Sequence, residues 1–124
     1  MPNEQSHLDL AKRNETFLQS INSSTFPDWV VTVAFYAALH YIDAFLARRG
    51  RIEIKGHGTR EDSIKLYPEL FSTAIWYFHL KSASVRARYY GDQLLPGEMS
   101  KHTDQHLVNI RKTITRILSP PATQ

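Results

Sequence analysis

The chain has 124 residues, which is enough for one domain with a single hydrophobic core and too few for a second domain. Because it contains no cysteine, disulfides and thiolate zinc sites are excluded, and a reducing compartment, the cytoplasm, is expected. The net charge of +3 is modest but unevenly spread, since residues 48–60 hold five basic residues and one acidic residue. The first ten residues lack the basic and apolar regions of a secretory signal.

Two long helices are predicted in the first half of the chain. The first begins near Ser6, which together with Asp9 resembles a capping box, and runs to about residue 22. The second begins at Pro27, which suits a first helical turn, and ends before Gly50, which suits the position after a helix. Two arginines precede this glycine, where the negative end of the helix dipole favours cations.

The second helix is apolar enough to raise the question of a membrane span. Residues 29–47 are nearly long enough to cross a bilayer. In lipid, however, His40 and Asp43 would lack an evident partner, and the other helices carry apolar stripes that need covering. We therefore expect this segment at the centre of a soluble bundle.

Three more helices are predicted in the second half. Thr59 and Asp62 resemble the capping box of a short helix that runs to about Leu66. A fourth helix follows Pro68 and ends at Gly91, with an apolar stripe of Leu70, Phe71, Ala74, Ile75, Phe78, Val85 and Tyr89. A last helix stops at two prolines and has core spacing at Leu107, Ile110, Ile114, Ile117 and Leu118.

These elements predict an all-α fold without strands. We expect an antiparallel up-and-down bundle of four long helices plus one short helix, a single domain over residues 1–124 with its core at about 6–118. The second helix is apolar around nearly its whole circumference. A second copy of the chain is therefore expected to cover part of it in a homodimer.

Polar side chains interrupt two of the predicted helices at helical spacing. The second helix carries Thr32, Tyr36, His40 and Asp43 on one face, and the fourth carries Tyr77, Lys81, Ser84 and Arg88. One interpretation is that these groups satisfy one another inside the bundle. The other is a functional groove between the helices, in which Asp43 orients His40, raises its pKa and pairs with Arg88.

Metal and nucleotide motifs are weak. His102 and His106 are four residues apart, but no third ligand or HExxH motif accompanies them. No nucleophile elbow, Walker loop or dinucleotide fingerprint occurs. We therefore expect neither a metal nor a cofactor.

Three motifs occur in order along the chain: W-x5-FYAALHY-x-x-A-x-LA at 29–47, H-x-x-R at 57–60 and Y-x-x-L-x3-S-x-x-ARY at 77–89. Together they resemble the HEPN superfamily of bacterial and archaeal helical-bundle proteins. The resemblance implies a bundle of four or five helices that commonly forms homodimers. Many members are metal-independent ribonucleases of toxin–antitoxin and other defence systems, and others are inactive and bind nucleotides, RNA or proteins.

The catalytic pattern of the active members is a histidine following an arginine by R-x4–6-H late in the bundle. Here the nearest histidine after Arg88 is His102, which is too distant, and the literal match, Arg51 with His57, falls in the loop after the second helix. Two hypotheses stay open. One is a rearranged ribonuclease site, in which a histidine moves a proton and an arginine stabilises the phosphorane; its catalytic residues are His57, Arg60, His40 and Arg88.

The other hypothesis is a non-catalytic module that binds RNA, a nucleotide or a protein encoded nearby. Its binding residues are Tyr36, Asp43, Arg48, Arg49, Arg51, Tyr77, Ser84 and Tyr89. The arginines after the second helix form either a solvated loop or an anion-binding rim. In this hypothesis His57 and Arg60 anchor the loop to the bundle.

Overall fold

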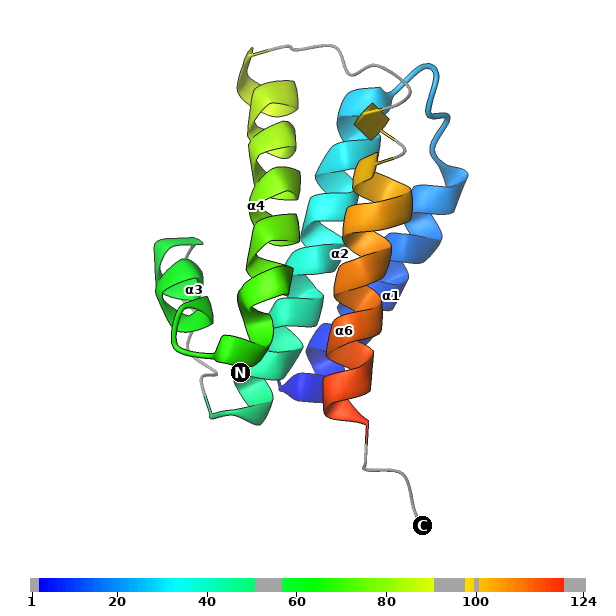
Figure 1. Cartoon of the computed structure of the whole chain (residues 1–124). Coiled ribbons are helices and arrows are strands. Elements are labelled where there is room, and N and C mark those ends of the chain that lie inside the picture. Colours follow the sequence, from blue (N-terminus) through cyan, green and yellow to red (C-terminus); the bar gives the residue numbers. More distant parts are fainter. Residues whose placement is uncertain (1–2, 51–56, 91–97, 100, 120–124) are drawn as a thin grey trace.

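The computed structural model describes residues 3–50, 57–90, 98–99 and 101–119, and every element in these ranges is helical. The α-helices are α1 (Glu4–Ser20), α2 (Pro27–Arg48), α3 (His57–Ile64), α4 (Phe71–Val85) and α6 (Val108–Leu118). A 3₁₀ turn, η1 (Pro68–Leu70), precedes α4, a π-helical turn, η2 (Arg86–Tyr90), follows it, and π-helical η3 (Lys101–Leu107) precedes α6. Figure 1 shows the four long helices side by side, alternating in direction, with α3 beside α4. The all-α prediction is confirmed for the described residues.

Helix α2 forms the centre of the bundle because its neighbours cover it on all sides. It packs against α1, α4, η3 and α6, and its side chains are buried almost without interruption from Val30 to Leu46. The helix is long and apolar enough to cross a membrane. Its most apolar stretch of 18 residues has a mean hydropathy of 1.6, and 83% of this stretch is buried inside the bundle. A core helix of a soluble protein has the same properties. The other helices of the same chain already bury most of α2, so its apolar surface alone is no argument for the expected second copy of the chain.

The ends of α2 follow from local backbone chemistry. Pro27 occupies its first turn, where a missing N–H costs nothing, and Gly50 has a φ of +84° just after its end. The start of α1 differs from the prediction: its cap is Asn3, whose side chain accepts a hydrogen bond of 2.8 Å from the Ser6 backbone N–H. Helix α3 likewise begins at His57, two residues before the predicted cap Thr59.

Helix α4 buries a different face from the one that its predicted apolar stripe indicates. Its buried face consists of Thr73, Tyr77, Leu80, Ala83 and Ser84. The large apolar side chains Phe71, Ile75 and Phe78 are 58, 60 and 39% exposed. In α6, by contrast, Ile110 and Ile114 are fully buried, as predicted. Among the described residues, α4 therefore carries a row of uncovered apolar side chains; Phe17, Phe26 and Trp29 at the α1–α2 turn are also about half exposed.

Candidate functional site

A buried ion pair joins α2 to α3. The Arg60 guanidinium donates to both carboxylate oxygens of Asp43, with Nε–Oδ1 at 2.7 Å and Nη2–Oδ2 at 2.9 Å. The two side chains are only 8 and 4% exposed. This forked geometry satisfies both charges without water. It also contradicts the predicted pair between Asp43 and Arg88, because the counter-charge comes from Arg60 on the short helix.

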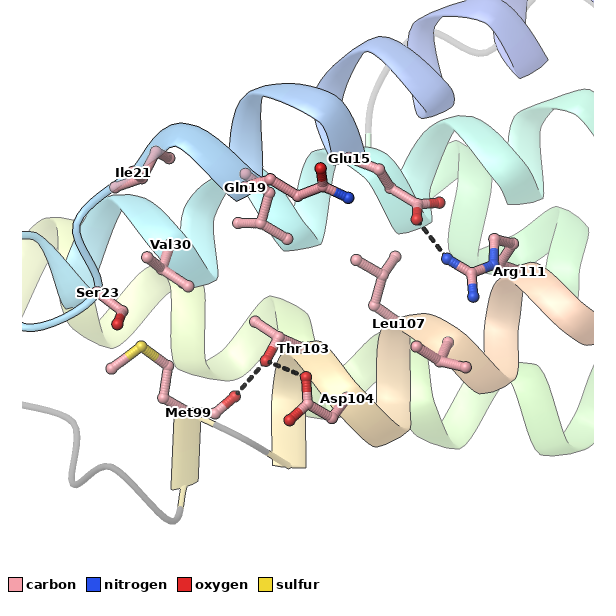
Figure 2. Close-up of a pocket in the computed structure, with 12 residues that line it drawn as sticks. Glu15, Gln19, Ile21, Ser23, Val30, Met99, Thr103, Asp104, Leu107 and Arg111 are labelled. Atoms are coloured by element: carbon pink, nitrogen blue, oxygen red, sulfur yellow. Dashed lines mark hydrogen bonds and ion pairs between the residues drawn. The ribbon is translucent and has the colours of Figure 1, made fainter.

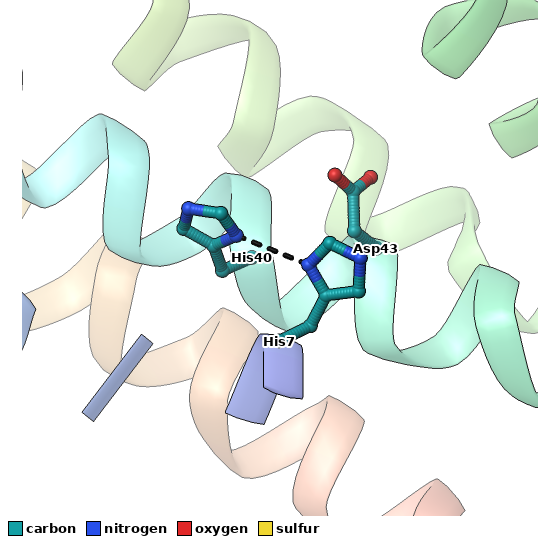
Figure 3. A group of neighbouring side chains, drawn as sticks. All are labelled: His7, His40 and Asp43. Carbon is teal, nitrogen blue, oxygen red and sulfur yellow. Dashed lines mark hydrogen bonds between the residues drawn. The ribbon is translucent and has the colours of Figure 1, made fainter. Parts of the chain in front are cut away.

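Two histidines lie beside this pair. His7 of α1 and His40 of α2 bring their Nδ1 atoms to 3.1 Å, and their rings stack with centroids 5.4 Å apart. Figure 3 shows both imidazoles next to the Asp43 carboxylate. His7 is 9% exposed, while His40 is half-buried. His7 was not among the predicted site residues, because it lies in the first turn of α1 and its 33-residue separation from His40 gives no periodic signal.

The electrostatics of the histidines differ from the prediction. Burial lowers the pKa of the His40 imidazole below its ordinary value, and His7 and Arg60 lower it further, while Asp43 opposes the shift. Burial and Arg60 similarly lower the pKa of His7, again against Asp43. The expected rise in the pKa of His40 is therefore wrong in sign, because desolvation outweighs one carboxylate that is already paired.

Two of the residues predicted to share a groove between α2 and α4 are in contact. The Arg88 Nη1 donates to the Tyr36 hydroxyl at 3.2 Å, so these two residues do meet. Tyr77 lies beside Arg60: burial raises the pKa of its phenol to about 12, while Arg60 opposes the shift. Ser84 is fully buried between the helices. His40, however, faces His7 on α1, so its imidazole is not paired with Arg88.

The predicted basic rim is largely neutralised by acids where it is described. Arg48 forms a forked pair with Glu4, with Nε–Oε1 at 2.5 Å and Nη2–Oε2 at 2.7 Å. Arg49 binds Glu69 at 2.8 Å. Arg51 and the side chain of His57 lie outside the described residues. Tyr89 is 71% exposed and packs against the Arg88 guanidinium, 5.1 Å from its ring centroid.

A separate cavity of about 470 Å³ lies at another part of the bundle, between α1, the start of α2 and the η3–α6 helix (Figure 2). None of the predicted site residues lines it. Its charged groups include Asp104 and the ion pair between Glu15 and Arg111, whose Nη1–Oε2 distance is 2.5 Å. The acidic charge of the wall does not suit RNA or a nucleotide.

Comparison with protein-family models, with characterised proteins and with solved structures gives no significant match. The structure defines the chain as an all-α helical-bundle protein in which the half-buried His40 lies beside the buried side chains of His7, Asp43 and Arg60.

Proposed function

We propose that the chain is a non-catalytic, HEPN-like interaction module that forms a homodimer through α4. The observation that carries this proposal is the row of Phe71, Ile75 and Phe78, spaced by four and three residues, so that their side chains share one helical face. Each is between 39 and 60% exposed. Contiguous apolar side chains on a helix surface are typical of protein interaction sites rather than of a solvated face.

A second copy of the chain fits this surface. The row is flanked by small or polar exposed residues, Ser72, His79 and Ser82, as in an interface with an apolar centre and a polar rim. Two α4 helices related by a two-fold axis bury the same residues on both sides, which is the usual symmetry of homodimers. The motif resemblance also implies homodimers and a role in bacterial defence or toxin–antitoxin systems in the cytoplasm. That setting is part of the proposal.

The test is the mass of the particle in solution. The wild-type chain is expected to elute with twice its mass of 14.3 kDa in size-exclusion chromatography with light scattering. Ile75→Lys is expected to give monomers, because a buried lysine is expensive at the centre of an apolar interface. Ser72→Lys is the matched control, since it adds the same charge to an exposed neighbouring position. A wild type that stays monomeric at high concentration, or equal effects of both variants, contradicts the proposal.

The ribonuclease alternative is weakened because Arg60, one of its proposed catalytic residues, is buried. Arg60 is 7% exposed and both oxygens of Asp43 bind it, so a phosphate has no access to it without breaking the pair. We expect purified protein in a chelating buffer to leave total RNA intact. Cleavage that disappears on His57→Ala, with helical circular dichroism unchanged, contradicts this expectation and favours the enzyme.

A second candidate function, the binding of RNA or nucleotide phosphates, is favoured by a basic groove between α1 and α6. The groove has a volume of about 490 Å³ and is lined by Lys12, Arg111, Lys112 and Arg116, together with neutral side chains. Of these cations, Arg111 is already paired with Glu15. This groove, rather than the arginines after α2, is where the described structure concentrates unpaired positive charge.

RNA binding at this groove has a specific salt signature. We expect the affinity for single-stranded RNA to fall steeply with salt, and the double substitution Lys112→Ala, Arg116→Ala to weaken binding and flatten that slope. Lys65→Ala, which removes an exposed cation at the end of α3, is the control. An affinity that does not depend on salt excludes phosphate binding.

A further inference from the structure

Three side chains of metal-binding type converge where α1 packs against α2. His7, His40 and Asp43 each offer one ligand atom, and these atoms all lie within 4.8 Å of one another. Among the histidines and carboxylates that the structure describes, this is the group of three that meets such a criterion. The residues come from two helices, and the periodicity of the sequence does not predict that they meet.

The distances suit a small divalent ion. A tetrahedral metal with nitrogen ligands at 2.0–2.1 Å holds two of them about 3.3 Å apart. The Nδ1 atoms of His7 and His40 are 3.1 Å apart, so the imidazoles already have nearly this separation. The ligand oxygen of Asp43 lies within 4.8 Å of the histidine ligand atoms, so it completes the set when an ion draws it inward.

Arg60 hydrogen-bonds the carboxylate of Asp43 and so supports this ligand without binding the ion itself. It fixes the orientation of Asp43 through both oxygens, and each carboxylate oxygen keeps a further lone pair for an ion. The positive charge of Arg60 also repels a cation. The affinity is therefore expected to be lower than that of a structural zinc site with four protein ligands.

We infer that His7, His40 and Asp43 bind one divalent ion of the zinc class, such as Zn²⁺ or Co²⁺, with water as a further ligand. Two imidazoles and one carboxylate suit these ions, whereas Mg²⁺ and Ca²⁺ prefer sets of six or more oxygen ligands. His40 is half-buried, so part of the cluster lies near solvent, from which a water ligand can come. The bound ion ties the first turn of α1 to the middle of α2. This inference does not depend on the proposed homodimer.

Titration calorimetry of the full chain, freed of metal by a chelator, tests the site with Zn²⁺ as the probe. We expect one Zn²⁺ per chain and no binding of Mg²⁺ at the same concentration. His40→Gln is expected to lower the Zn²⁺ affinity by more than about 100-fold, because loss of an outer partner alone costs about 10–100-fold. The absence of stoichiometric Zn²⁺ binding in the wild type overturns the inference.

A second pair of histidines provides the matched control. His102 and His106 also bring their Nδ1 atoms together, at 3.2 Å, and the ring of His79 stacks on His106 with centroids 5.1 Å apart. His106→Gln is expected to bind Zn²⁺ as the wild type does. Binding that is lost in His106→Gln and kept in His40→Gln overturns the inference, because the ion then occupies the other pair.

The visible spectrum of the Co²⁺-loaded wild type gives an independent measurement that needs no variant. Four- or five-coordinate Co²⁺ with nitrogen and oxygen ligands absorbs much more strongly than octahedral aqueous Co²⁺. We expect intense bands that grow to one equivalent and disappear when Zn²⁺ displaces Co²⁺. A weak octahedral spectrum throughout the titration also overturns the site.

Discussion

Asp43 and Arg60 place one negative and one positive charge inside the bundle. In such a pair the attraction largely offsets the cost of removing both ions from water, so the pair itself adds little stability. Removal of one partner is different, because the other charge is left buried and uncompensated. The pair therefore makes the docking of α3 onto α2 specific, since any other arrangement leaves a bare charge.

Neutralising Asp43 is expected to destabilise the fold strongly. We expect Asp43→Asn to lower the free energy of unfolding by about 3–5 kcal/mol, measured by urea denaturation. Glu69→Gln is the control, since it neutralises the acid of an exposed arginine pair and is expected to cost at most about 1 kcal/mol. Equal losses in the two variants would show that burial of the Asp43 pair has no special cost.

His102 is expected to make the protein sensitive to acid. Burial lowers the pKa of His102 to about 4, and His106, His79 and Arg86 lower it too, while Glu98 opposes the shift. The folded state therefore binds its proton less readily than the unfolded state, where the histidine pKa is about 6.5. The contribution of His102 to the free energy of unfolding is fully present above about pH 6.5 and is lost as the pH falls towards 4. The loss for this residue is about 1–3 kcal/mol.

Urea denaturation between pH 4 and pH 7 checks this dependence. His102→Gln should flatten the profile relative to the wild type, because it removes the titrating group and keeps a polar side chain. His7, His40 and His106 also have lowered pKa values, so part of the slope should persist. A variant with the same slope as the wild type argues against His102 as an acid-sensitive group.

For individual residues, the sequence predicted which polar side chains are buried better than it predicted their partners. It indicated that a buried Asp43 needs a cation, which is correct, but it paired Asp43 with Arg88 instead of Arg60. The choice depends on how the short helix α3 docks, and no periodic pattern carries that information. For the same reason His7 was missed as the partner of His40.

Among the elements, α2 and α4 show why some features of a helix can be predicted and others cannot. The bounds of α2 follow from Pro27 and Gly50, which act through their own backbone geometry. The orientation of α4 depends on a comparison of two faces that both contain large apolar residues. The shape of the neighbouring helices decides that Tyr77 and Leu80 are buried instead of Phe71 and Ile75. Because both faces contain large apolar residues, the sequence pattern does not show which face is buried.

The end of α2 should be sensitive to substitution of Gly50. Its φ of +84° is costly for a residue with a Cβ atom, although a Cβ atom there would have no described atom within 4 Å apart from its chain neighbours. We expect Gly50→Ala to lower the free energy of unfolding by about 1–2 kcal/mol, entirely through the backbone. Gly50→Asn should cost less, because asparagine tolerates the left-handed region. Urea denaturation of both variants distinguishes this strain from a steric clash, for which the larger asparagine would be worse.

The whole molecule is organised around one central helix, and its local stability should reflect that arrangement. Helix α2 contacts α1, α4 and α6, whereas α3 has only eight residues and is held by Arg60, Ile64 and the ion pair between Glu61 and Lys81. A helix this short is not stable without its tertiary contacts.

Hydrogen exchange is expected to distinguish these elements. The amides in the middle of α2, around Ala38, should exchange only through global unfolding, and those at the end of α3, near Ile64, should exchange faster through local opening. The measurement is native-state exchange by NMR at increasing urea concentration. Equal protection of both helices at low urea would contradict a separately opening α3.

The burial of α2 also has a consequence for how the chain is made. During synthesis α2 leaves the ribosome before α4 and α6, so α1 is the only one of its long neighbours present to shield a 22-residue segment of membrane-like hydropathy. In that interval chaperones and lipid compete for the same apolar surface. Correct folding of the nascent protein thus depends on how quickly the second half of the chain is synthesised after the first.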